Sequence, residues 1–175
     1  MNSLTQFKKI LILPLLIALT LVVAAVPALA TPVCNVTTET LALGHYPSGL
    51  LNLMCQDGRI WQLITRIRGD SDVYVTRHTF PVGAHTGWHT HPGPSLITVI
   101  SGELTVYEAD NPTCTPTVYH AGESFTDIGC GDVHLVRNEG NVQAVDVAVQ
   151  IVPAGAPRRI DVTPAPSNCP LISCP

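Results

Sequence analysis

The sequence predicts an all-β fold, and three observations lead to this prediction. From residue 59 onward, apolar residues recur with a period of two or in short runs, as they do in β-strands. Glycine, proline, asparagine and aspartate bound these runs, and no sustained period near 3.6 indicates an amphipathic helix. Many short strands in a chain of this length are typical of a closed barrel or a sandwich.

The expected strands follow one another closely, with turn residues between them. Residues 73 to 80 alternate well, although the pattern does not say which face points inward. Ser101 and Gly102 separate two runs and predict a tight hairpin, because glycine supplies the positive φ that such turns require. We expect strands at Ile60–Ile67, Val73–Phe80, Gly87–His91, Leu96–Ile100, Glu103–Glu108, Thr117–Tyr119, Ser124–Asp127, His134–Asn138 and Ala144–Val152.

The first thirty residues have the pattern of a secretory signal peptide. Two lysines precede an apolar run at Ile10–Val26, and Ala28 and Ala30 stand at the two positions that a signal peptidase recognises. A membrane anchor is the alternative, but the run is short for a span and Pro14 interrupts it. We therefore expect cleavage after Ala30, a secreted or periplasmic protein, and no stable membrane anchor after cleavage.

Residues 31–175 fit one domain of ordinary size. Within it we expect a barrel core at about 59–153 and an extended, proline-rich tail at 154–175. Seven arginines, no lysine and thirteen acidic residues give this part a net charge of −6. That charge argues against nucleic acid as a partner, and the absence of lysine excludes chemistry that needs a lysine amine.

Six cysteines follow the leader, in a part of the chain that an oxidising compartment would allow to form disulfides. Their pairing cannot be deduced from the sequence. Bridges would pin both terminal extensions to the body and contribute about 2–4 kcal/mol each. Metal ligation by thiolates is the alternative, but the chain has no C-x-x-C spacing. We expect Cys130 to be a disulfide partner. The other candidates for disulfides are Cys34, Cys55, Cys114, Cys169 and Cys174.

Three of the histidines lie close together in the sequence, at His85, His89 and His91. Residues two apart on a strand point to the same face, so His89 and His91 project together as half of a metal site. The third ligand must come from elsewhere, and His134 is the best candidate. A site without metal is the alternative, but three buried imidazoles would then need other partners for their nitrogens.

The residues around the histidine pair resemble the first motif of the cupin family, G-x5-H-x-H-x3-E-x6-G. Gly83, His89, His91 and Gly102 stand at its spacing throughout. The departure is Ser95, which occupies the position of the glutamate. A neutral hydroxyl is a poor ligand for a divalent ion and brings no compensating charge.

A second motif of the family, G-x5-P-x-G-x2-H-x3-N, follows in the right order. Its end is matched by Gly131, His134 and Asn138. Its beginning departs from the motif. Gly122 lies one residue too far before Gly131, and Gly129 stands at the proline position. With both motifs, residues 83–138 are similar to a small single-domain cupin. The resemblance implies a jelly-roll β-barrel. From the cysteine positions, we expect disulfides to pin its N- and C-terminal extensions to the body.

In the family, the two histidines and the glutamate of the first motif and the histidine of the second hold a metal ion. The resemblance therefore implies one divalent metal ion at His89, His91 and His134, without a carboxylate ligand. Such a site carries about +2 rather than +1 and should attract a small anionic molecule. Imidazole suits zinc, copper, iron and nickel, so the sequence does not distinguish among these metals.

Three further residues are expected near this site. His85 shares parity with the histidine pair and could be a fourth ligand, an acid or base beside the metal, or a residue of the rim. His78 could orient a ligand or substrate if it points inward, and is otherwise a hydrogen-bonded barrel histidine. Ser95 as a nucleophile is disfavoured, because no oxyanion-hole or third-residue signal accompanies it.

Two functions fit such a site. The first is a metal-dependent oxidoreductase of the dioxygenase type, because three protein ligands leave positions open for dioxygen and a substrate. The second is a non-catalytic module that binds a metal or small molecule. Proton transfer in an enzyme would require His78, His85 or Glu103 to face the pocket, whereas a purely apolar lining would favour binding. The sequence does not decide the oligomeric state, and a homodimer is possible.

Overall fold

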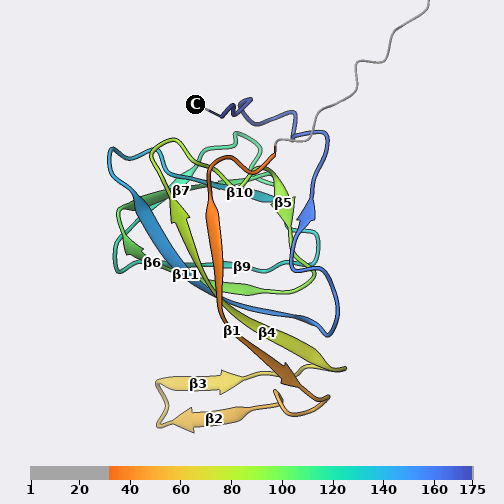
Figure 1. Ribbon diagram of the computed structural model, residues 1–175. Helices are drawn as coiled ribbons and strands as arrows, with labels where there is room; N and C mark the ends of the chain where they lie inside the picture. Colours follow the sequence, from red (N-terminus) through yellow and green to blue (C-terminus); the bar gives the residue numbers. More distant parts are fainter. Residues whose placement is uncertain (1–31, 175) are drawn as a thin grey trace, which may run out of the picture.

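The computed structural model describes residues 32–174, and within this range the chain folds as β-strands joined by turns and loops (Figure 1). Two five-stranded sheets and one two-stranded sheet are present, with antiparallel pairing throughout. No helix in the described residues is long and apolar enough to cross a membrane. The expected signal peptide lies outside the described residues.

The two large sheets contain the strands expected of a jelly roll, in which sequence neighbours are distributed between two facing sheets. In the order in which they pair, the first sheet consists of β1 (Thr37–Tyr46), β4 (Ser71–Phe80), β11 (Ala144–Pro153), β6 (Ser95–Ser101) and β9 (Ser124–Asp127). The second consists of β12 (Ile160–Asp161), β5 (His89–Thr90), β10 (His134–Arg137), β7 (Glu103–Glu108) and β8 (Thr117–His120). The predicted all-β, cupin-like barrel is confirmed.

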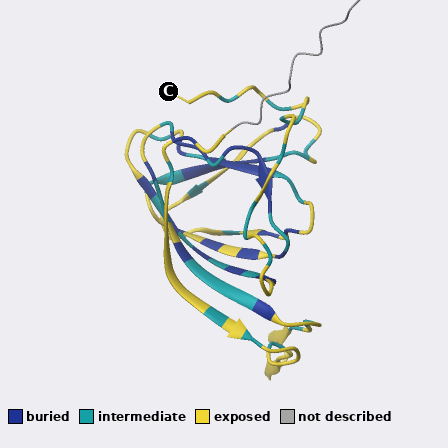
Figure 2. Ribbon diagram, turned by 45° about the vertical axis from the view of Figure 1, so that its right-hand side comes forward, coloured by how far each residue is buried: buried dark blue, intermediate teal, exposed yellow. Residues whose placement is uncertain are grey.

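The central strands of the second sheet, β5, β10 and β7, are largely buried (Figure 2). Its inner face contributes Leu104, Val106 and Val136 to a core that also contains Phe80 of the first sheet. A second cluster contains four buried residues, against which tail residues pack: Trp88, Tyr107, Cys114 and Leu135. The C-terminal tail therefore covers part of the barrel with apolar contacts.

The large sheets extend beyond the expected barrel core of 59–153 at both ends. β1 pairs with β4 along its length, and β12 of the tail pairs with β5. The sequence did not indicate β1 because almost all of its side chains are exposed, so it has no buried face to mark with apolar residues. The predicted strand Ile60–Ile67 is shorter, at β3 (Trp61–Ile64), and pairs only with β2 (Met54–Asp57) in a hairpin outside the large sheets.

The hairpin predicted at Ser101 and Gly102 is wrong, although Gly102 does have a positive φ of 71°. β6 and β7, on either side of the turn, belong to different sheets, so the chain changes sheets there. A Cβ atom on Gly102 would lie 2.8 Å from the Cα of Ala144. The close approach of β11, as well as the turn, therefore requires glycine.

Two disulfides confirm that both extensions are pinned to the body. Cys34 bonds to Cys174, and Cys114 bonds to Cys169 of the tail. The expected disulfide at Cys130 is wrong, since Cys130 and Cys55 are free and exposed. Cys130 follows β9 with its thiol directed at the carbonyl of Pro92, whereas Cys55 is on the separate β2–β3 hairpin.

We predict that replacing Cys114 and Cys169 together with alanine lowers the free energy of unfolding by about 2–4 kcal/mol, because the unfolded chain loses a cross-link. Denaturant titration of the oxidised protein measures the change. Replacing the free Cys55 with alanine is the control and should change stability by less than about 0.5 kcal/mol. Equal stability of the double variant and the wild type would contradict the prediction.

Candidate metal site

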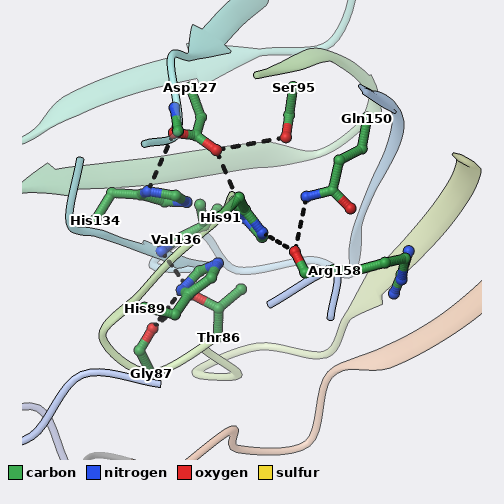
Figure 3. Close-up of polar contacts among 11 residues, drawn as sticks. Thr86, Gly87, His89, His91, Ser95, Asp127, His134, Val136, Gln150 and Arg158 are labelled. Atoms are coloured by element: carbon green, nitrogen blue, oxygen red, sulfur yellow. Dashed lines mark hydrogen bonds and ion pairs between the residues drawn. The ribbon is translucent and has the colours of Figure 1, made fainter. Parts of the chain in front are cut away.

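Three histidines converge inside the barrel from adjacent parts of the second sheet (Figure 3). His89 on β5 pairs in register with His134 on β10, and His91 follows just after β5. Their ring centroids lie 4.3 Å apart for His89 and His134 and 4.8 Å apart for His89 and His91. One ring nitrogen from each lies within 4.8 Å of the other two. The structure thus brings together the three residues that the motifs predicted.

Backbone carbonyls orient two of the three imidazoles. Nδ1 of His89 donates a hydrogen bond to the carbonyl of Gly87 at 2.9 Å. Nδ1 of His91 donates to the carbonyl of Arg158 at 2.5 Å. Because a carbonyl can only accept, each ring carries its proton on Nδ1 and keeps Nε2 unprotonated. This is the usual way in which a protein prepares a histidine to bind metal.

All three rings are neutral at neutral pH. Burial lowers the pKa of His89 well below its ordinary value and lowers the pKa of His91. Burial, together with the nearby His91, lowers the pKa of His134 to about 3. Metal ions bind the neutral form of imidazole, so no proton has to be displaced at neutral pH.

His134 carries the strongest indication of a missing partner. Its Nδ1 atom is buried and makes no hydrogen bond of ordinary geometry. An unsatisfied polar nitrogen in this position has a cost of about 1–3 kcal/mol. A divalent ion among the three rings would compensate for it, so these residues fit a metal of the kind that the motifs imply.

The sequence reasoning missed Asp127, a buried carboxylate at the end of β9. Its Oδ2 atom lies 3.6 Å from Nε2 of His91, and its Oδ1 atom lies 3.7 Å from Nδ1 of His134. The hydroxyl of Ser95 and the backbone N–H of Gly129 donate hydrogen bonds to it. A buried carboxylate therefore lies beside the three predicted histidines. Only the pairing of β6 with β9 reveals the proximity, and no sequence motif encodes that pairing.

The other expected site residues separate into two groups. Ser95 and His78 both line the cavity that contains the three histidines. His78 places Nδ1 2.6 Å from Oδ1 of Asp146, which is also buried in the lining. His85 is buried outside this lining, where its Nδ1 accepts a hydrogen bond from the backbone of Gly87. Glu103 does not line the cavity and forms an ion pair with the exposed His120.

The cavity has a volume of about 130 Å³ and a mixed polar and apolar lining. Two arginines of the tail, Arg158 and Arg159, form part of its wall. Arg159 is held by hydrogen bonds to the carbonyl of Thr86 at 2.7 Å and to the carboxylate of Asp161 at 2.6 Å. The tail therefore contributes positive charge to the cavity, in addition to the carbonyl that orients His91.

The comparison with known protein families agrees with this fold. A family model described as a cupin domain matches residues 76–152, which include all three histidines and Asp127. Residues 76–152 therefore match the cupin superfamily. No curated protein matches the chain significantly.

Solved structures also resemble the chain, with modest superposition. An uncharacterized conserved protein with a double-stranded β-helix domain from Klebsiella pneumoniae is 26% identical, with 51% of this chain and 73% of that one covered and a TM-score of 0.43. A predicted oxalate decarboxylase from Thermotoga maritima is 20% identical, covering 49% and 83%, with a TM-score of 0.39. A cupin superfamily protein from Desulfitobacterium hafniense is 13% identical, covering 67% and 77%, with a TM-score of 0.44.

The asparagine that ends the second motif has a structural role. Asn138 is fully buried, and its side-chain amide donates to the carbonyls of Phe80 and Val142 at 2.8 Å each. Its Oδ1 atom accepts a hydrogen bond from the backbone of Gly140. The residue joins the end of β4 to the turn that leads into β11.

We predict that Asn138→Ala lowers the free energy of unfolding by about 2–4 kcal/mol, because buried backbone groups lose their partners and a small cavity forms. Denaturant titration measures this loss. Asn141→Ala, at an exposed position of the same turn, is the control and should remain within about 0.5 kcal/mol of the wild type. A similar change in both variants would argue against this role of Asn138.

Proposed function

We propose that the protein is an exported, metal-dependent oxidoreductase of the dioxygenase type that acts on a small anionic molecule. The observation that carries the proposal is the convergence of three neutral imidazoles on one interior point. His89, His91 and His134 would hold one divalent ion there. Such an ion would supply Lewis-acid chemistry and open positions for dioxygen and substrate. The chain would orient the imidazoles and limit the space around them.

The pair formed by His78 and Asp146 favours an enzyme over a binding module. The carboxylate oxygen Oδ1 of Asp146 lies 2.6 Å from Nδ1 of His78, within the same cavity lining as the metal site. A carboxylate that accepts the Nδ1 proton fixes the tautomer of the ring and leaves Nε2 available as a base. The alternative function, a non-catalytic module that binds a metal or small molecule, does not require such a pair.

The size and charge of the cavity restrict the substrate. A cavity of about 150 Å³ in another protein is known to hold benzene. The volume of about 130 Å³ here therefore suits a molecule of roughly that size. The guanidinium of Arg159 in the wall would favour an anion, most simply a carboxylate.

Export is supported by the two disulfides, which indicate an oxidising environment. The pattern of the first thirty residues agrees with this environment. We propose a secreted or periplasmic location, with the mature chain starting at residue 31 as a single domain. A homodimer stays a prediction.

We predict that the mature protein binds close to one equivalent of divalent metal and that His134→Ala abolishes this stoichiometric binding, because the remaining two histidines no longer enclose the ion. Elemental analysis after dialysis gives the stoichiometry. His120→Ala removes an exposed histidine of the same sheet and should leave the metal content unchanged. Unchanged metal content in His134→Ala would rule out the proposed site.

We also predict that Arg159→Gln weakens the binding of acetate to the metal-loaded protein roughly tenfold, because a charge-assisted hydrogen bond is lost from the wall. Isothermal titration calorimetry measures the affinity. Arg77→Gln is the matched control, since Arg77 is exposed on β4 and does not line the cavity. If both variants bind acetate as the wild type does, the proposed role of Arg159 is wrong.

A further inference from the structure

We infer that Asp127 is the carboxylate ligand of the metal site, supplied from β9 where the family motif would place a glutamate on β6. The inference rests on the proposed function, since it takes the three-histidine metal site as given. It concerns the one position at which this chain departs from the first motif, Ser95.

The register of the strands explains how a carboxylate on β9 can replace one that the motif places on β6. Ser95 on β6 and Asp127 on β9 are direct partners in an antiparallel pair. Side chains of such partners lie on the same face, with Cβ atoms about 4.5–5.5 Å apart. A side chain from residue 127 can therefore enter the space that a glutamate at residue 95 would use. The short side chain of Ser95 leaves that space free and donates a hydrogen bond to the carboxylate.

The distances suit coordination better than hydrogen bonding. Nitrogen and oxygen ligands lie about 2.0–2.2 Å from a metal such as zinc, so two neighbouring ligand atoms are about 3.0–3.5 Å apart. The two carboxylate oxygens of Asp127 lie 3.6 Å and 3.7 Å from the nearest nitrogens of His91 and His134. Both separations exceed the range of an ordinary hydrogen bond. A shift of a few tenths of an ångström would bring these atoms to ligand spacing.

The burial of Asp127 provides an independent argument. The residue is 5% exposed, and taking a carboxylate out of water is costly unless a positive charge compensates. In the described part of the chain, its ion-pair partners are His91 and His134, both of which are neutral in the metal-binding form. No arginine lies within ion-pair distance of it there. A divalent cation among the histidines would provide the missing charge.

The consequence is a different donor set from the one the motif suggests. Three imidazoles and one carboxylate would leave a site charge of about +1 rather than +2. Carboxylate oxygen is a harder donor than imidazole, so the set suits iron and manganese better than three imidazoles alone. The cavity would then attract an anion less strongly than a site without the carboxylate.

Cobalt(II) is a suitable probe, because its visible spectrum reports the ligand set as well as the affinity. We expect Asp127→Asn to weaken Co²⁺ binding at least about tenfold and to alter the spectrum of the saturated protein. Asn is isosteric with Asp and can keep the hydrogen bond from Gly129. Asp72→Asn is the control, because it removes a carboxylate that pairs with His45 outside the cavity lining, and it should bind Co²⁺ within about threefold of the wild type.

A second test exchanges the residue types at positions 95 and 127, and it does not depend on the result for Asp127→Asn. Ser95→Glu combined with Asp127→Ser returns the carboxylate to β6, and we expect Co²⁺ affinity within about threefold of the wild type. Affinity of Asp127→Asn within threefold of the wild type, or a saturated spectrum that superimposes on the wild-type spectrum, would overturn the inference. Failure of the proposed metal site itself is distinguishable, since the wild type would then bind no Co²⁺ or His134→Ala would bind it equally well.

Discussion

Polar side chains inside a β-barrel require partners, and the interior of this protein is organised by that requirement. Four ionisable groups meet within a few ångströms: three imidazoles and the carboxylate of Asp127. Some of their polar atoms are satisfied by the chain itself, through the carbonyls of Gly87 and Arg158 and the N–H of Gly129. Nδ1 of His134 remains without a hydrogen-bond partner. A single cation would coordinate the ring nitrogens that the chain leaves without partners, and it would balance the charge of the buried carboxylate.

The same requirement explains why the tail beyond β11 belongs to the functional unit. The tail covers apolar residues of the second sheet, pairs with β5 through β12, and lines the cavity with two arginines. Disulfides at Cys169 and Cys174 fix its far part to the body. A proline-rich segment with little regular structure is thereby held firmly enough to orient a histidine.

Local patterns in the sequence predicted most of the fold, because a buried face leaves a period-two record. β6 and β11 have such faces and were expected within one residue of their ends. β1 was missed, since its side chains are mostly exposed and need not alternate. The turn at Gly102 was located correctly but assigned to a hairpin, because a glycine with positive φ serves equally well where a chain changes sheets.

The candidate site divides in the same way. His89 and His91 are two apart on one chain segment, so their convergence follows from strand geometry alone. Strand geometry does not reach His134, which was chosen as the best remaining histidine and was supported by the second family motif. Asp127 was not foreseen, because its relation to the histidines depends on which strand lies beside β6, and 32 residues separate it from Ser95. The residues around Ser95 and around Asp127 do not indicate that these two strands pair.

The bond from His91 to Arg158 has a further consequence, because its acceptor is a main-chain oxygen. Substitution of Arg158 by any other residue would leave that main-chain acceptor in place. An insertion or deletion in the link between β11 and β12 would displace it. The orientation of His91 is therefore tolerant of point changes at residue 158 but sensitive to the length of the link. Among related chains, the spacing of this segment should vary less than its composition.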